Sequence, residues 1–326
     1  MNPWLGRSVL VTGCNGFVGG WLVDALVRRK AGVVGLIRDN IPDSTLELLG
    51  AQPKIRVVHG DAEDLDCVER TLAEYGIEVI FHLAAQSQVG VANRSPRSTI
   101  KTNIMATLNI LEAARTYGRL KAVVVASSDK AYGAHKRLPY REEDALRGAY
   151  PYDASKACTD LLAQSYGRAF GLPVAVARCG NIFGPADVNL NRIVPDTIRS
   201  LCRKTTPVIR SDGEYVRDYL YVSDAVAAYL ALAGGLLEGK PGVAGEAFNF
   251  GTNRPVTVKR LVEMMIEISG RKVKPKILNT AKGEIREQYL SSDKAGKILG
   301  WRPKERLEDG LGKTYRWYAR FFKETE

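Results

Sequence analysis

Tyr152 and Lys156 are the two residues whose types and spacing most directly suggest chemistry. They lie four residues apart in the run Y-P-Y-D-A-S-K, so on a helix both side chains would share one face. An ammonium beside a phenol lowers the pKa of the phenol from its reference of about 10. The phenolate can then take a proton from an alcohol while hydride leaves the attached carbon. The pair therefore predicts oxidation of a hydroxyl, although two exposed residues of an amphipathic helix would show the same spacing.

A glycine-rich turn supplies the second part of such a site. The run T-G-C-N-G-F-V-G places Gly13, Gly16 and Gly19 directly after an apolar strand and before a helical pattern. Glycines permit a tight turn and close approach of the backbone to a pyrophosphate, which then lies at the positive end of the helix. Because the turn stands between a strand and a helix, it predicts dinucleotide binding.

The end of the second strand should distinguish NAD from NADP. Arg38 would favour a ribose 2'-phosphate and the adjacent Asp39 would accept a hydrogen bond from a free 2'-hydroxyl. We therefore expect NAD or NADP as a tightly bound cofactor, with the choice left open. Asp61, which follows the third strand, would meet the adenine or else cap the next helix.

The elements that must position these residues alternate along the first half of the chain. Apolar strands are expected at 8–12, 33–37, 55–59, 79–83, 122–126 and 174–177, and helices at about 63–74, 99–117 and up to about 170. Strand and helix alternating over this length predict an α/β fold, a doubly wound parallel sheet of the Rossmann type.

The second half of the chain predicts a smaller, discontinuous C-terminal substrate lobe. We assign residues 1–179 and 214–251 to the dinucleotide-binding domain, since 225–237 and a strand at 247–250 look like a return to the sheet. Residues 180–213 and 252–326 carry much of the remaining Pro, Arg and Lys and form the lobe.

Composition excludes several function classes. The chain has 326 residues, 45% hydrophobic and 25% charged, with no apolar run long enough to span a membrane. Its net charge of +11 is interleaved with acids, so we expect no nucleic-acid partner. Five scattered cysteines, all expected to be buried, give no metal site. A cytoplasmic location is the default expectation.

Six ordered motifs together resemble one enzyme family. They are the glycine turn, H-L-A-A-Q-S at 82–87, S-S-D-K-A-Y-G at 127–133, Y-x-x-x-K, R-C-G-N-I-F-G-P at 178–185 and R-D-Y-L-Y-V-S-D at 217–224. This set is similar to the extended short-chain dehydrogenase/reductases of the NAD-dependent epimerase/dehydratase family, which act on nucleotide sugars. The resemblance spans nearly the whole chain.

The resemblance implies roles for named residues. Ser128 would hydrogen-bond the sugar O4 beside Tyr152, Lys156 would also reach the nicotinamide ribose, and Asn103 would order the active-site helix. The residues expected at the cofactor are Gly13, Asn15, Gly16, Phe17, Val18, Gly19, Arg38, Asp39, Asp61, Ala62, Leu83, Ala84, Ala85, Gln86, Asn103 and Lys156.

A nucleotide-diphosphate sugar is the expected substrate partner. Asn181 and Arg217 would hold the diphosphate, a task suited to the guanidinium's fork of donors; alternatively Arg217 forms a surface ion pair with Asp218 or Asp224. The residues expected at the substrate are Gln86, Ser87, Asn181, Arg192, Val194, Arg210, Arg217, Glu284 and Arg286.

The two ionisable residues that follow Ser128 favour a 4,6-dehydratase over a 4-epimerase. A 4-epimerase needs only oxidation and reduction at C4, whereas a 4,6-dehydratase must also remove the C5 proton and expel the C6 hydroxyl. Asp129 would be the acid at C6, and Lys130 a base or a C6-orienting group. The S-D-K form resembles the CDP-glucose 4,6-dehydratases. Alternatively, Lys130 pairs with an acid at the cleft edge.

We therefore predict an NAD(P)-dependent nucleotide-sugar 4,6-dehydratase most like the CDP-glucose enzymes. The rivals are a UDP-sugar 4-epimerase and a non-enzymatic NAD(P)-sensing binding protein. One departure from the family pattern is Ala281-Lys282-Gly283-Glu284, where many relatives carry an arginine, so Lys282 or Arg286 would replace it. The resemblance also implies a homodimer joined through helices near 99–117 and 150–170.

Overall fold

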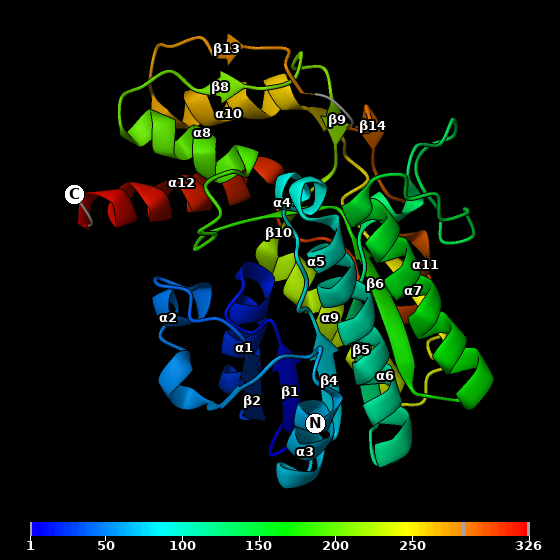
Figure 1. Cartoon of the computed structure of the whole chain (residues 1–326). Helices are drawn as coiled ribbons and strands as arrows, with labels where there is room; N and C mark the ends of the chain where they lie inside the picture. Colours follow the sequence, from blue (N-terminus) through cyan, green and yellow to red (C-terminus); the bar gives the residue numbers. More distant parts are fainter. Residues whose placement is uncertain (1, 282–283, 325–326) are drawn as a thin grey trace.

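A parallel β-sheet forms the centre of the computed structural model, which describes residues 2–281 and 284–324 (Figure 1). Its seven strands, within those residues, follow the order β11-β6-β5-β4-β1-β2-β3. Their bounds are β1 Ser8–Thr12, β2 Gly32–Ile37, β3 Arg56–His59, β4 Val79–His82, β5 Ala122–Ala126, β6 Val174–Cys179 and β11 Glu246–Phe250. All the neighbours pair in parallel, which confirms the predicted doubly wound sheet.

Alternating side chains of the strands supply two separate apolar layers. Val9 and Val11 of β1 point into the layer that contains helices α1 (Phe17–Arg28) and α9 (Val222–Leu237). Leu10 points to the opposite layer, made with α3 (Leu65–Glu74), α6 (Ala106–Tyr117) and α7 (Pro151–Phe170). Because successive strand residues face opposite sides, a continuous apolar run is what a sheet covered on both faces requires.

The helix predicted near 99–117 is divided in the structure. It comprises α5 (Pro96–Ile100), a π-helical turn η2 (Lys101–Met105) and α6. The π turn inserts an extra residue into the helical repeat, and Asn103 lies within it with its side chain buried. The irregular turn therefore coincides with a residue expected to order the active site.

The C-terminal lobe lies above the carboxyl ends of the sheet strands (Figure 1). Its core packs α8 (Ile193–Cys202), α10 (Val258–Ser269) and α12 (Leu307–Glu324) together. Short strands complete it: β7 Asn181–Phe183, β8 Val208–Ile209, β9 Val216–Arg217, β10 Tyr219–Tyr221, β12 Val256–Thr257, β13 Lys276–Ile277 and β14 Glu287–Gln288. The remaining elements are α2 Thr45–Leu48, η1 Gln52–Lys54, α4 Val89–Arg94, η3 Asp129–Tyr132 and α11 Asp293–Leu299.

Two segments make contacts across the predicted domain boundaries. Strand β9 pairs with β12 and β14 of the lobe, although residues 214–251 were assigned to the dinucleotide-binding domain. Helix α11 packs against β11 and α9 of the sheet domain, although 252–326 were assigned to the lobe. The boundaries themselves stay a prediction.

Cysteine burial differs from the expectation. Cys14, Cys67 and Cys179 are buried, but Cys158 is exposed and Cys202 is half-buried. Cys158 lies on α7 on a face that no described element of the chain covers, so the expectation of five buried cysteines is wrong there. Among the described helices, none combines the length and apolar character that crossing a bilayer requires.

Candidate active site

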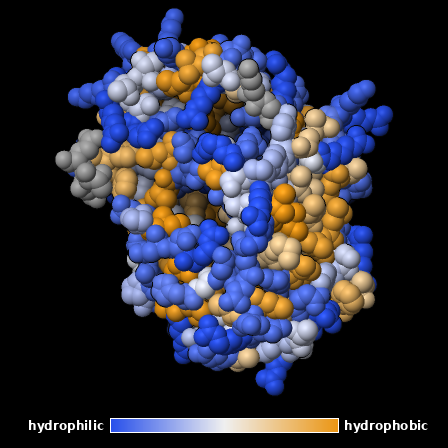
Figure 2. Space-filling view, viewed as in Figure 1, coloured by the Kyte–Doolittle hydropathy of each residue, from blue (hydrophilic) through white to orange (hydrophobic). Residues whose placement is uncertain are grey.

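A cavity of about 920 Å³ opens where the carboxyl ends of the sheet strands meet the lobe. In Figure 2 the surface is hollowed between the lobe and the sheet domain. The strand order reverses between β1 and β4, and in open parallel sheets a ligand binds at such a switch point. The predicted residues that line the cavity are Gly13, Asn15, Gly16, Phe17, Val18, Gly19, Arg38, Asp39, Asp61, Ala62, Leu83, Ala84, Ala85, Gln86, Ser87, Ser128, Lys130, Tyr152, Lys156, Asn181, Arg192, Val194, Arg210, Arg217 and Glu284.

Backbone crowding explains the glycines of the first turn. Gly13 has a φ of +68°, and a Cβ there would lie 2.8 Å from the backbone nitrogen of Ala84. A Cβ on Gly19 would lie 2.0 Å from the carbonyl oxygen of Gly13. The turn leads directly into α1, a 12-residue helix whose N-cap is Gly16. The free amides at this helix end fit the pyrophosphate of a dinucleotide.

Carboxylates surround Arg38 at the end of β2. Its Nε lies 2.8 Å from Asp39 Oδ2, and a terminal nitrogen lies 3.8 Å from Asp61 Oδ2. Asp39 raises the pKa of Arg38 most, by accepting a hydrogen bond, and Asp61 adds to the effect. The helix-capping alternative for Asp61 is wrong, since Asp64 caps α3 by accepting from the Cys67 amide. The cluster carries one positive and two negative side chains.

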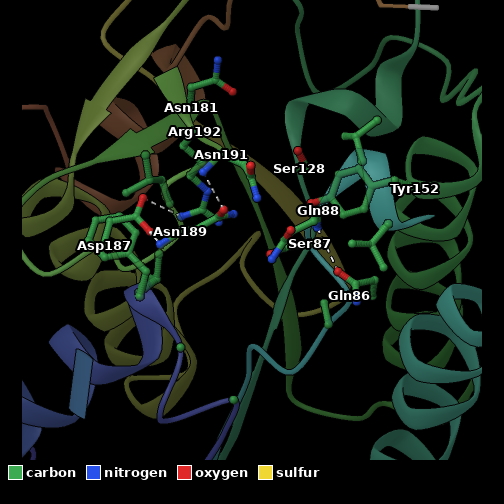
Figure 3. Close-up of a pocket in the computed structure, with 18 of the residues that line it drawn as sticks. Gln86, Ser87, Gln88, Ser128, Tyr152, Asn181, Asp187, Asn189, Asn191 and Arg192 are labelled. Carbon is green, nitrogen blue, oxygen red and sulfur yellow. Dashed lines mark hydrogen bonds and ion pairs between the residues drawn. The ribbon is translucent and has the colours of Figure 1, made fainter. Parts of the chain in front are cut away.

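Tyr152 and Ser128 lie together on one wall of the cavity (Figure 3). Burial is the main cause that raises the pKa of Tyr152, to about 12, the carboxylate of Asp129 adds to it, and the Ser128 hydroxyl opposes it. The expected lowering of the Tyr152 pKa is therefore wrong for the protein by itself. Lys156 does lie on the same face of α7, but its Nζ donates to the Ala126 carbonyl at 2.6 Å, and burial lowers its pKa to about 8.

Asp129 is the most enclosed acid beside this wall. Its side chain is buried, Oδ1 accepts from the Ser128 hydroxyl at 3.0 Å, and Oδ2 has no hydrogen-bond partner among the described residues. Burial raises the pKa of Asp129, while the charge of Lys130 opposes that change. A carboxyl with a raised pKa holds its proton at higher pH, so this group suits proton donation.

Lys130 extends from the same turn but meets a neutral partner. Its Nζ donates to the Gln288 Oε1 at 3.2 Å. In the described part of the chain no carboxylate forms a salt bridge with Lys130, so the alternative of an ion pair at the cleft edge is not what the structure shows. Lys130 lines the cavity and Gln288 is fully buried behind it.

Asn103 orders the helix that carries Tyr152 without reaching the cavity itself. Its Oδ1 accepts from the Gln86 amide at 2.7 Å, and its Nδ2 donates to Ser155 Oγ at 2.8 Å. Ser155 in turn donates to the Tyr152 carbonyl. The Asn103 side chain thus joins the segment after β4, which carries Gln86, to the first turn of α7, which carries Tyr152.

A buried ion pair joins α7 to strand β6 of the sheet. Arg178 of β6 donates twice to Asp160 of α7, at 2.8 Å from each nitrogen, and also to the Tyr132 hydroxyl at 2.6 Å. Both charged side chains are almost completely buried. Such a bidentate pair is geometrically specific, so it fixes α7 against β6 and against the turn that bears Ser128.

Arg217 is buried at the lobe side of the cavity. Its NH1 donates to the Arg286 carbonyl at 3.0 Å, and its NH2 lies 3.5 Å from Glu284 Oε2. The alternative pairing with Asp218 or Asp224 is wrong: Asp218 accepts from the amides of 252 and 253, and Asp224 from those of 304 and 305. Arg217 therefore presents a charge close to the place expected for a diphosphate.

The loop between β7 and α8 contributes polar side chains that the sequence prediction partly missed. Arg192 donates to the buried Asp187 at 2.9 Å, as Figure 3 shows on the wall opposite Tyr152. Asn189 and Asn191 also line the cavity but were not predicted. Asp187 Oδ1 accepts from the Asn189 amide, and Asn189 Oδ1 accepts from the Asn191 amide. Hydrogen bonds to the amide two residues later are typical of Asp and Asn in turns, so the D-V-N-L-N-R run indicates a turn.

Three predicted residues do not line the cavity. Asp129 and Asn103 are buried beside it, whereas Arg286 is largely exposed and pairs with Asp212 at 3.2 Å. Lys282, the other expected replacement for the missing arginine, lies with Gly283 outside the described residues. Arg286 contacts the cavity-lining Arg217 through its backbone carbonyl, which accepts from that guanidinium.

Comparisons with known proteins agree with this geometry. The family model of GDP-mannose 4,6 dehydratase matches residues 10–314. The CDP-glucose 4,6-dehydratase of Salmonella typhimurium is 31% identical, over 97% of this chain and 92% of that protein. A UDP-glucose 4-epimerase of Thermotoga maritima, solved with UDP-glucose, superposes with a TM-score of 0.89 at 33% identity, over 97% of this chain and all of that one. The dTDP-glucose 4,6-dehydratase of Bacillus anthracis, solved with NAD, gives a TM-score of 0.83 at 26% identity, over 97% of each.

The chain belongs to the GDP-mannose 4,6-dehydratase family of nucleotide-sugar epimerases and dehydratases. The predictions of an extended short-chain dehydrogenase/reductase fold and of an NAD(P)-dependent enzyme acting on nucleotide sugars are thereby confirmed. Dehydratases and epimerases match at nearly equal identity, so the chemistry at C5 and C6 has to be argued from the site.

Proposed function

We propose that this protein is a nucleotide-sugar 4,6-dehydratase, most like the CDP-glucose enzymes, that forms a 4-keto-6-deoxy sugar. The observation that carries the proposal is the buried Asp129 carboxyl, bonded to Ser128 on the wall that bears Tyr152. An epimerase needs no second acid beside the base at C4. A dehydratase needs one to protonate the departing C6 hydroxyl.

The residues of this chain divide the reaction between them. Ser128 holds the sugar O4 and Tyr152 takes the O4 proton as the C4–H hydride leaves. An oxidised nicotinamide dinucleotide bound at the glycine turn would accept the C4 hydride and later return it to C6, and its positive ring would favour the phenolate. The C5 proton then passes to Lys130, the C6–O bond breaks, and Asp129 gives its proton to the hydroxyl, which departs as water. Lys130 then returns its proton to C5, which completes the 4-keto-6-deoxy sugar.

The charges around Arg38 support NAD as the cofactor. Asp39 and Asp61 already neutralise the guanidinium, so a 2'-phosphate would meet a net negative cluster. Asp39 is the exposed acid that can accept from a free 2'-hydroxyl. The NAD-bound dTDP-glucose 4,6-dehydratase of Bacillus anthracis gives further support.

An exposed apolar face supports a homodimer. Ile100, Met105, Leu161 and Phe170 are between 42% and 58% exposed on α5, η2 and α7, and Figure 2 shows apolar side chains gathered over these elements. Contiguous exposed apolar surface of this kind marks interaction sites. A second copy of the chain would bury it by pairing these helices. The cytoplasmic location stays a prediction.

Product mass tests the proposed reaction. The purified protein is incubated with CDP-glucose, UDP-glucose, dTDP-glucose, UDP-N-acetylglucosamine and GDP-mannose, each with NAD or NADP. We expect one nucleotide sugar, most favourably CDP-glucose, to lose the mass of one water. An unchanged mass with a new stereoisomer at C4 would make the protein an epimerase, the alternative that the similarity to the Thermotoga maritima enzyme supports.

A further inference from the structure

Gln288 of the C-terminal lobe contacts the turn of the sheet domain that carries Asp129 and Lys130. It is the last residue of β14 in the lobe, yet its Oε1 accepts from Lys130, which is 158 positions earlier in the turn after β5. The Gln288 side chain is fully buried. The contact is therefore a fixed tertiary contact, formed only when the lobe and the sheet domain are assembled.

Two unpaired polar atoms flank this contact. Gln288 Nε2 and Asp129 Oδ2 are buried, and neither has a hydrogen-bond partner among the residues that the structure describes. Buried polar atoms in folded proteins are nearly always paired, and exceptions gather where a group has a chemical task. Burial raises the pKa of the Tyr140 hydroxyl, and the Gln288 amide acts on that hydroxyl to oppose the rise. Gln288 therefore has polar neighbours at both ends, and Asp129 Oδ2 is the atom left for a ligand.

Charges from the surrounding elements converge on the same place. Asp129 of η3 and Asp153 of α7 both act electrostatically on Lys130, and Arg217 of β9 acts on Asp129. Left without a fixed acceptor, the Lys130 side chain could swing to either carboxylate. A neutral acceptor at 3.2 Å holds its position without adding charge.

We propose that Gln288 is a positioning residue that holds the Lys130 amine at the C5–C6 edge of the sugar for the elimination step. The proposal rests on the proposed dehydratase function. In that step the C5 proton passes to the Lys130 amine, the electrons of the C5–H bond form the C5–C6 double bond, and the C6 hydroxyl leaves with the Asp129 proton as water. Gln288 touches none of the reacting atoms and acts through Lys130.

The strand register links this positioning to substrate binding. Gln288 of β14 lies opposite Arg217 of β9 in a parallel pair, and Arg217 is the charge placed for the diphosphate. One small sheet of the lobe therefore carries both the diphosphate contact and the acceptor for Lys130. Binding of the diphosphate and placement of the amine are then set by the same strands.

The test separates C4 oxidation from loss of water. Gln288→Met keeps the length of the side chain and removes the acceptor. With the substrate identified by the mass assay, reduced cofactor is followed at 340 nm in single turnovers, and water loss and deuterium uptake at C5 are followed by mass. We expect C4 oxidation to stay within threefold of wild type, and water loss to fall about 10- to 100-fold because the amine is misplaced.

A double-mutant comparison distinguishes a Gln288 that acts through Lys130 from a Gln288 that only stabilises the fold. If Gln288 acts through Lys130, Gln288→Met causes no further loss of elimination in a Lys130→Met background. Glu287→Ala, at the exposed neighbouring position of β14, is the matched control and should leave each step unchanged. Gln288→Leu repeats the test if the methionine variant does not fold.

Three outcomes would overturn the proposal. The first is additive losses of elimination in the double variant. The second is a Gln288 variant in which C4 oxidation, water loss and the unfolding temperature all fall together. The third is unchanged elimination in both Gln288 variants. A wild-type protein that epimerises C4 without losing water would be recognised before any variant is made, and would overturn the dehydratase assignment together with this role.

Discussion

The Ser128 hydroxyl donates a 3.0 Å hydrogen bond to Oδ1 of Asp129, its neighbour in the chain. The same hydroxyl oxygen accepts from the Lys130 amide at 3.2 Å, so Ser128 caps the short helix η3 that carries Asp129 and Lys130. One side chain thus connects the group expected at the sugar O4 with the acid expected at C6.

Asp129→Asn should separate the two halves of the reaction. The amide keeps the size of the carboxyl but cannot protonate the leaving hydroxyl, so we expect water loss to fall about 10²- to 10⁴-fold. C4 oxidation should remain, and reduced cofactor should accumulate at 340 nm. Equal losses in both steps would show that Asp129 has a structural role instead. Since burial raises the Asp129 pKa, wild-type elimination should also decline as the pH rises through that pKa.

Tyr152→Phe should stop the first step. Removing the phenol oxygen removes the base at O4, which is worth about 10²- to 10⁴-fold in rate. The measurement is reduced cofactor formed in a single turnover with the identified substrate. Tyr150→Phe is a matched control, because Tyr150 lies two residues earlier and is partly exposed at the N-cap of α7. Comparable losses in both variants would remove Tyr152 from the mechanism.

Asp39→Ala should shift the cofactor preference towards NADP. The change frees Arg38 from its 2.8 Å partner and removes one of the two negative charges beside it. We expect the ratio of the NADP and NAD dissociation constants to fall about tenfold, equivalent to about 1.4 kcal/mol. Titration calorimetry on protein stripped of dinucleotide measures both constants. Adding Arg38→Ala should abolish the gain for NADP; an unchanged ratio in Asp39→Ala would contradict the prediction.

Leu161→Glu should produce monomers. Leu161 is 58% exposed on α7 within the apolar face assigned to the dimer, and a charge buried at an interface opposes association. Sedimentation or light scattering measures the mass of each variant. Leu5→Glu is the control, because Leu5 is 65% exposed near the N-terminus, outside that face. A wild-type protein that is already monomeric would refute the dimer.

Asp153→Asn should change how stability depends on pH. Burial raises the pKa of Asp153 to about 6, Asp129 adds to the rise, and Lys130 opposes it. A raised carboxyl pKa means that the folded protein binds more protons than the unfolded chain, so wild-type stability falls as the pH rises through about 6. The free energy of unfolding of the variant relative to wild type should increase by about 1 kcal/mol between pH 5 and pH 8.

Chemical denaturation at the two pH values provides that comparison. Asp66→Asn, at an exposed position in the first turn of α3, serves as the control for a lost surface charge. A difference between Asp153→Asn and wild type that does not change with pH would show that the Asp153 carboxyl has the same pKa in the folded and unfolded protein.

The sequence by itself determined the parts of this protein that local geometry controls. The glycine turn between a strand and a helix, and a tyrosine and lysine four residues apart on α7, follow from the backbone repeat over a few residues. Alternating apolar strands and amphipathic helices likewise specified the doubly wound sheet, because each strand must be covered on both faces.

Tertiary structure alone decided the electrostatic state of the site. Whether Asp129 is buried, whether Tyr152 has a raised pKa, and whether Arg217 meets Glu284 or Asp218 all depend on which distant segments exclude water from each group. The contact between Lys130 and Gln288 spans 158 positions and joins the turn after β5 to β14, which pairs with β9. Desolvation and long-range pairing arise only when the chain is packed, so they cannot be inferred from the spacing of residues along the sequence.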